Sequence, residues 1–343
     1  MRNMNKDNIV VHRQSNIELL RVISMLMVVL GHYYVLSYFG NIDTVSFNLV
    51  GMQFLGAWSK VAVDIFVIIT GYFLVNQTFR WKKVLKLLSC TYFWGIIVLL
   101  LGFALGLSIK TDYIYKSLFP LTPLNWFARS YLLLYISIPL FNKIINSVSK
   151  ARLGQIIIAL TTIFYTVPTL ISTFISGGGY LTSYFTFGIM YMIGAYIRKY
   201  GDAKLDKISI YAGIMSIILI LASILWNDIH MHEGLFIMYL AHKGNSVVGL
   251  LAAIGIFTIF KNMKIPYSPF INTVASTTFA VYLIHNNPII SDWLWNTVVQ
   301  ANNYFDSPFF LLHMVSITTL IFVFCSMIEL IRLNIFNRYY KYN

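Results

Sequence analysis

An arginine and a histidine stand eleven residues apart in the first long apolar stretch of the chain, at Arg21 and His32. At about 100° per residue of an α-helix, this spacing is three turns plus roughly 20°. The two side chains therefore share one helix face and lie roughly 16 Å apart along the axis. An arginine binds phosphate or carboxylate groups, and a histidine exchanges protons near neutral pH. One helix face could thus hold an anion at one point and perform acid–base chemistry at another.

Several other ionisable residues also lie in apolar stretches. A charge within a bilayer costs about 3 kcal/mol or more unless it is paired or hydrated, so such residues are functional candidates. Glu18 lies one turn before Arg21 and is expected to pair with it. Spacing favours two further mutual ion pairs, Lys60 with Asp64 and Glu329 with Arg332. A purely structural role, as an anchor at the membrane interface or as a packing residue, is the alternative to a functional one. It stays open for Trp126, Arg129, His285 and His313.

Composition places these residues in a membrane protein. Hydrophobic residues make up 58% of the 343 residues and charged residues only 11%, whereas a soluble domain carries about 25% charged residues. Such a chain cannot hide its apolar surface from water, so we expect most of its surroundings to be lipid. The net charge of +13 could suggest nucleic acid, but the positions of the charges give another explanation.

Ten stretches are long and apolar enough to span a bilayer, which takes roughly 20 residues. The eighth is the weakest, because Lys243 and Asn245 interrupt its start, and Pro168 predicts a kink in the fifth. The fold class expected is all-α, a polytopic bundle of about ten transmembrane helices. The predicted spans are about 17–38, 54–75, 88–108, 126–146, 153–175, 180–198, 208–226, 241–260, 270–290 and 309–332.

The lysines and arginines favour alternate loops. Nineteen of the 25 lie in the two tails and in the loops after even-numbered spans, which predicts both termini in the cytoplasm. The positive charge then needs no nucleic-acid partner. No cleavage site follows the first span, so we expect it to be retained. The whole chain, 1–343, is expected to be one membrane domain with cytoplasmic tails at 1–16 and 333–343.

Motifs for other chemistries are weak or missing. His230, His232 and Glu233 form a cluster in a predicted outer loop without metal-ligand spacing, so no metal site is expected. Cys90 and Cys325 both lie in apolar stretches and predict neither a disulfide framework nor a zinc site. The sequence contains no glycine-rich phosphate loop and no G-x-S-x-G elbow for a serine nucleophile.

In these residues the chain resembles the acyltransferase-3 family of ten-span membrane acyltransferases. The main match is to a motif of the family in which an arginine and a histidine are separated by ten residues, here Arg21 and His32. Four further matches follow in order over roughly residues 15–335. They are Val63-Asp64-Ile65-Phe66 with Gly71-Tyr72-Phe73, Phe79-Arg80-Trp81-Lys82-Lys83, Trp126-Phe127 with Tyr131-Leu132 and Pro139-Leu140-Phe141-Asn142, and Val281-Tyr282-Leu283-Ile284-His285. The chain departs from the family at Thr70, where Ser is commoner, and in having more Lys than Arg after the second span.

The resemblance implies transfer of an acyl group, usually acetyl, from cytoplasmic acyl-CoA to a hydroxyl of an exported or cell-surface glycan. His32 would be the general base on that hydroxyl, or would carry the acyl group itself, and Glu18 would orient Arg21. Acetyl-CoA is expected as a substrate and not as a bound cofactor. Its phosphates would contact Arg21, Arg80, Lys82 and Lys83. The glycan acceptor would contact Trp126, Arg129 and His285.

Two other classes of function stay open. Some relatives are proposed to export polysaccharide, so the chain could be an exporter without acyl transfer. It could also be an assembly partner of proteins that synthesise glycans. Within the enzyme hypothesis, the acyl group could be succinyl, and the acceptor could be a capsular polysaccharide, a lipid-linked unit, teichoic acid or a small sugar. The expected location is a cell membrane, taken as a bacterial plasma membrane.

Overall fold

The structure, a computed structural model, describes residues 13–40, 42, 44–119, 125–170, 180–230, 240 and 245–342. Every regular element in these ranges is a helix, which confirms the all-α prediction for the described part of the chain. Parts of the predicted tails and loops lie outside the described residues. Among the residues discussed above, these are Lys243, His232 and Glu233.

The helices of the described residues are α1 (Ser15–Leu36), α2 (Phe47–Leu74), α3 (Trp81–Ala104), α4 (Thr111–Leu118), α5 (Trp126–Ser147), α6 (Lys150–Thr161), η1 (Thr162–Thr166), α7 (Val167–Leu170), α8 (Tyr180–Tyr200), α9 (Ala203–Ile229), α11 (Val247–Asn262), α12 (Pro269–Ala275), α13 (Thr278–His285), η2 (Trp293–Val299), η3 (Ala301–Tyr304) and α14 (Phe310–Tyr342). The longer helices overlap the predicted spans, although α2 and α3 begin before the predicted starts at 54 and 88.

Among the residues that the structure describes, six helical segments are long and apolar enough to cross a membrane, by length and composition, so the protein is a multi-pass membrane protein. They are α1, α2, α3, the segment Lys150–Leu170, α9 and Phe310–Phe336 of α14. Helices α5 and α8 have 22 and 21 residues but are not among the six, and α11 has only 16. The total of ten spans therefore stays a prediction.

The segments predicted to lie in the cytoplasm contact one another at one end of the bundle. Asn16, at the start of α1, donates to the Phe260 carbonyl at the end of α11, and Lys261 pairs with Asp206 near the start of α9. Lys150 of α6 lies 3.8 Å from Asp202, just before α9. The alternation of basic loops thus correctly grouped these segments. That this end faces the cytoplasm stays a prediction.

The ninth predicted span is not one continuous helix, so the prediction for 270–290 is wrong in this respect. Helix α12 ends at Ala275 and α13 begins at Thr278. The hydroxyls of Ser276, Thr277 and Thr278 donate to the carbonyls of Thr273, Val274 and Ala275 at 2.7, 2.7 and 2.9 Å. Serine and threonine side chains satisfy carbonyls that a broken helix leaves open, which makes the break tolerable inside a bundle.

The proline of the fifth predicted span lies beside an irregular stretch, as predicted. Residues Thr162–Thr166 form a π-helical segment directly before the short α7, which contains Pro168. Proline has no N–H to donate and its ring crowds the preceding turn, so the regular hydrogen-bond ladder changes there.

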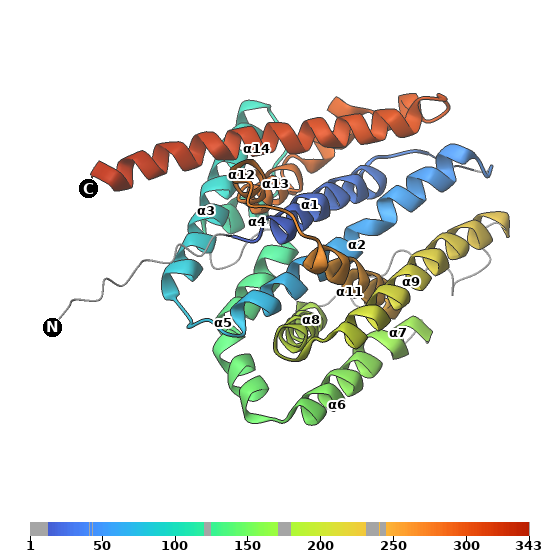
Figure 1. Cartoon of the computed structure of the whole chain (residues 1–343). Coiled ribbons are helices and arrows are strands. Elements are labelled where there is room, and N and C mark those ends of the chain that lie inside the picture. The colour runs from blue at the N-terminus through green and yellow to red at the C-terminus, as the bar shows by residue number, and fades with distance from the viewer. Residues whose placement is uncertain are drawn as a thin grey trace.

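Helices α1 and α2 form the centre of the molecule. Helix α1 packs along α2, and the other side of α2 packs against α8. In Figure 1, α1 and α2 lie between α14 on one side and α9 with α6 on the other. Helix α1 also contacts α12, α13 and α14. The helix that carries Arg21 and His32 is therefore held by neighbours from both halves of the chain.

Two glycines allow α2 and α8 to approach closely, and their replacement should disturb this packing. A Cβ at Gly71 would overlap the carbonyl of Tyr191, and one at Gly194 would overlap that of Ile68. We expect Gly71→Ala or Gly194→Ala to destabilise the protein by about 1–3 kcal/mol, the usual cost of overpacking. Thermal unfolding in detergent measures this.

The matched control is Gly154→Ala on α6. There the nearest atom to an added Cβ is 3.8 Å away, which is an ordinary van der Waals distance. The melting temperature should stay near that of wild type. Equal stability of all three variants would contradict the close approach of α2 and α8.

Candidate functional site

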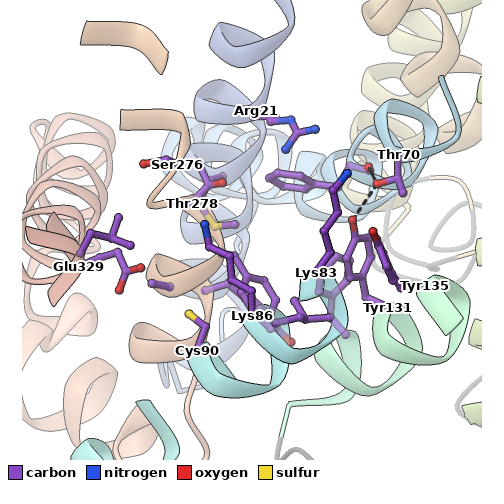
Figure 2. A pocket seen from close by; sticks show the side chains of 18 of the residues that line it. Arg21, Thr70, Lys83, Lys86, Cys90, Tyr131, Tyr135, Ser276, Thr278 and Glu329 are labelled. Atoms are coloured by element: carbon purple, nitrogen blue, oxygen red, sulfur yellow. Dashed lines mark hydrogen bonds between the residues drawn. The ribbon is translucent and has the colours of Figure 1, made fainter. Parts of the chain in front are cut away.

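A basic cavity of about 440 Å³ opens between α1, α2, α3, α5, α14 and the broken pair α12–α13. Four cationic side chains line it, from three helices: Arg21, Lys83, Lys86 and Arg332. Figure 2 shows the ends of Arg21, Lys83 and Lys86 in the same space. The volume lies within the range of about 300–1,000 Å³ found for small-molecule sites. A cavity with this lining suits a polyanionic ligand.

Arg332 is fixed by a buried network. Its Nε and Nη2 donate to Glu329 at 2.7 and 2.5 Å, which confirms the predicted pair. The Trp94 indole N–H donates to the same carboxylate at 2.9 Å. Glu329 is only 2% exposed. The carboxylate therefore holds the guanidinium at the cavity wall, and its own charge is offset by Arg332.

Loss of Glu329 should destabilise the protein strongly, because Arg332 and the Trp94 N–H would lose their shared partner. Removing one member of a buried ion pair costs about 3–5 kcal/mol. We expect Glu329→Leu to lower the unfolding free energy by about this amount, measured in detergent by chemical unfolding.

The control is Asp112→Leu, which breaks the i,i+4 pair of Asp112 with Lys116 on α4. There the aspartate side chain is 61% exposed. An exposed pair contributes about 1 kcal/mol or less. An equally small loss in both variants would refute the structural role of Glu329.

Arg21 contacts Glu18 only loosely. Its Nε lies 3.9 Å from a Glu18 carboxylate oxygen, and Arg13 lies 4.0 Å from the same oxygen. This distance confirms the predicted pairing but is too long for a hydrogen bond. Within the described residues the Arg21 Nε has no hydrogen-bond partner. The guanidinium is thus oriented by a nearby charge and keeps donors for a ligand.

Neutral polar groups line other parts of the cavity wall. The hydroxyls of Thr70 on α2 and Tyr131 on α5 lie 3.1 Å apart, as the dashed line in Figure 2 marks. Tyr135 lies one turn further along α5. Ser276 and Thr278, at the break between α12 and α13, also face the cavity. The break between α12 and α13 thus contributes two hydroxyl-bearing side chains to a wall of the cavity.

A second, small cavity of about 50 Å³ adjoins the basic one and is lined by His32, Ser59, Lys60 and Trp126. Four residues line both cavities: Met25, Phe66, Phe127 and Tyr282. On α1, the lining runs from Arg21 through Met25 and Val28 to His32. This run confirms that Arg21 and His32 share one helix face. These four residues, three of them apolar and one a tyrosine, form the wall between the basic cavity and the histidine.

His32 is in direct contact with a second histidine. Its Nδ1 lies 2.8 Å from Nε2 of His285, whose own Nδ1 lies 2.5 Å from the Val281 carbonyl oxygen one turn earlier in α13. The His285 side chain is fully buried. Because one ring nitrogen of His32 is occupied by this bond, only its Nε2 is left for a substrate in the small cavity.

The structure brings together some of the predicted site residues and not others. Lys83 lines the basic cavity, whereas Arg80 and Lys82 are exposed and line neither cavity. Trp126 lines the small cavity beside His32, while Arg129, one turn on, lines neither. Of the three cations after the second span, only Lys83 lines the cavity, and donor binding by any of them stays a prediction.

Lys60 and Asp64 do not form the predicted ion pair within 4 Å, in the part of the chain that the structure describes. The Lys60 ammonium instead lies 5.4 Å from the centroid of the Trp126 ring. A cation over an indole face is stabilised by the ring quadrupole. Lys60 therefore places a positive charge in the wall of the His32 cavity.

Sequence reasoning missed Arg332 as a site residue, because its pairing with Glu329 explained both charges. It also missed the hydroxyls of Ser276 and Thr278. The run Ser276-Thr277-Thr278 inside a predicted span was the available signal, since three adjacent hydroxyl residues favour a local break.

The fold and the site together define a multi-pass membrane protein in which a basic cavity adjoins a smaller cavity lined by a half-buried histidine, His32. A family model described as an acyltransferase domain, Acyl_transf_3, matches residues 14–329. The chain belongs to this family, and its expected reaction class is therefore acyl transfer. Neither a curated protein nor a solved structure matches the chain.

Proposed function

We propose that the protein is a membrane O-acyltransferase that moves an acetyl group from acetyl-CoA to a hydroxyl of an exported or cell-surface glycan. The observation that carries the proposal is the continuous α1 stripe from Arg21 in the basic cavity to His32 in the small one. A donor with a polyanionic head, a narrow arm and a reactive thioester has the same order of chemical parts.

The basic cavity holds the nucleotide end of the donor. Arg21, Lys83, Lys86 and Arg332 are four cationic side chains from three helices, and the charge of Arg332 is balanced by Glu329. The net positive charge that faces the donor therefore comes from Arg21, Lys83 and Lys86, and a guanidinium group such as that of Arg21 binds phosphate through paired N–H donors. The pantetheine arm passes Met25, Phe66, Phe127 and Tyr282. The thioester then lies beside His32.

The reaction is a direct transfer in which His32 is the general base. The acceptor hydroxyl gives its proton to Nε2 of His32 as its oxygen bonds to the thioester carbonyl carbon. The carbon–sulfur bond breaks, and the proton moves from His32 to the leaving thiolate, which gives the free thiol of CoA and an ester. A positioned histidine contributes about 10²–10⁴-fold to such steps.

Lys60 is the group that stabilises the oxyanion of the tetrahedral intermediate. Its ammonium is held over Trp126 in the wall of the His32 cavity, and its neighbour Asp64 is not close enough to neutralise it by a direct ion pair. A fixed positive charge in a water-poor site stabilises developing negative charge efficiently. Trp126, which lines the same cavity, is the contact for the sugar acceptor.

Expression of the wild-type protein in a host cell tests the function. Glycans are isolated, and base-labile O-acetyl groups are quantified by NMR, with Gly154→Ala membranes as the sample matched for protein level. We expect new O-acetyl groups with wild type and Gly154→Ala. Glycan export that changes without new acetyl groups would favour the exporter and overturn the proposal.

A further inference from the structure

We propose that His285 is a positioning residue that fixes the tautomer of His32 and thereby leaves Nε2 of His32 unprotonated toward the small cavity. This inference deepens the proposed function and rests on it. It replaces the sequence-based expectation that His285 binds the acceptor.

The Val281 carbonyl sets the direction of both hydrogen bonds, the one from His285 to Val281 and the one between His285 and His32. The Val281 carbonyl oxygen can only accept, so the proton between it and His285 belongs to Nδ1 of His285. A neutral imidazole carries one N–H, so Nε2 of His285 is an acceptor. Nδ1 of His32, 2.8 Å away, must then be the donor. The only lone pair left on the His32 ring is on Nε2.

The surroundings of His285 fit a positioning role and not contact with an acceptor. The side chain is 0% exposed and lines neither of the two cavities. The ring of Trp295 meets it edge-on, with centroids 6.5 Å apart. The His285 ring and its partner, the Val281 carbonyl, lie one turn apart in α13, and the helix therefore fixes the distance between them. The orientation of the acceptor nitrogen is therefore set by the helix itself.

The bond also strengthens during the reaction. When Nε2 of His32 takes the proton from the acceptor hydroxyl, the ring becomes an imidazolium, and its Nδ1–H donates as a charged group. His285 thus stabilises the charged form of His32 without receiving the proton. When the proton passes to the leaving sulfur, both rings return to their starting forms, so no proton is gained or lost by the pair.

Three variants separate positioning from other roles. His285→Leu removes the acceptor, and His285→Gln offers an amide oxygen near the position of Nε2. His230→Leu is the matched control, because the ring of His230 also bonds to a carbonyl one turn earlier, that of Trp226, but is exposed. Initial rates of O-acetylation are measured in membranes that supply the native glycan, with acetyl-CoA varied.

We expect kcat to fall about tenfold or more in His285→Leu, in line with the contribution of a positioned base. KM for acetyl-CoA should stay within about twofold, since His285 does not line the donor cavity. His285→Gln should keep most of kcat, and His230→Leu should resemble wild type. An unchanged kcat with a raised KM for the acceptor in His285→Leu would overturn the positioning role.

A spectroscopic measurement is independent of activity. In protein labelled with ¹⁵N-histidine and placed in lipid bilayers, ring nitrogens with and without a proton resonate at different positions, and the His32 signals are those lost in His32→Gln. We expect protonated Nδ1 and bare Nε2 for His32 in wild type, and a mixture of tautomers in His285→Leu. A protonated Nε2 in wild type would overturn the inference. If the wild-type protein transfers no acyl group, the proposed function is refuted, but the assignment of the His32 tautomer is not.

Discussion

Replacing His32 by alanine should reduce kcat for acyl transfer by about 10²–10⁴-fold, the contribution of a positioned general base. The fold should survive, because His32 lines a cavity and the smaller side chain creates no clash. KM for acetyl-CoA should change little, since His32 lies beyond the four residues that separate the two cavities. Initial rates with matched membrane amounts of wild type and His32→Ala measure this.

The control for this prediction is His313→Ala. Nδ1 of His313 lies 3.0 Å from the hydroxyl of Tyr33, the residue that follows His32, but His313 lines neither cavity. Its replacement should leave kcat within a few fold of wild type. Equal rates in His32→Ala and wild type would remove His32 from the chemistry.

Replacing Arg21 by methionine should instead weaken donor binding. A hydrogen bond to a charged group contributes about 1.5–3 kcal/mol, which corresponds to roughly 10- to 100-fold in affinity. We expect KM for acetyl-CoA to rise by about this factor in Arg21→Met, with a smaller change in kcat. Direct binding of acetyl-CoA, measured by calorimetry on purified protein, checks the same quantity without an acceptor.

Two other arginines provide the comparison for Arg21→Met. Arg152, exposed near the start of α6, lies outside the cavity and should be replaceable without effect. Arg80 was expected from the sequence to bind the donor but does not line the cavity, so Arg80→Met should raise KM far less than Arg21→Met. A larger effect at Arg80 than at Arg21 would contradict the proposal that the basic cavity binds the donor.

The α1 part of the site could be predicted from the sequence because helix periodicity is regular. The spacing of Arg21 and His32 fixed their common face, and the loop charges grouped the correct helix ends. These inferences depend only on local geometry and on where cations lie in a membrane protein.

The remaining part depends on contacts between distant segments, which no local pattern contains. The bond between His32 and His285 joins residues 253 positions apart, and Trp94 and Glu329 are 235 apart. The partner of Lys60 was predicted wrongly for a similar reason. Its i,i+4 spacing on α2 favours a pair with Asp64, but the ammonium lies over the ring of Trp126 at the start of α5, 66 residues further along the chain.

The central claim is that one path through the protein joins a donor cavity to an acid–base histidine. The most direct test uses acetyl-CoA labelled separately in its acetyl group and in its nucleotide, supplied to membranes that contain wild type. We predict that the acetyl label becomes base-labile label on glycan, while the nucleotide label stays in soluble CoA. Both labels remaining on CoA, while the amount of exported glycan changes, would contradict acyl transfer and favour an exporter.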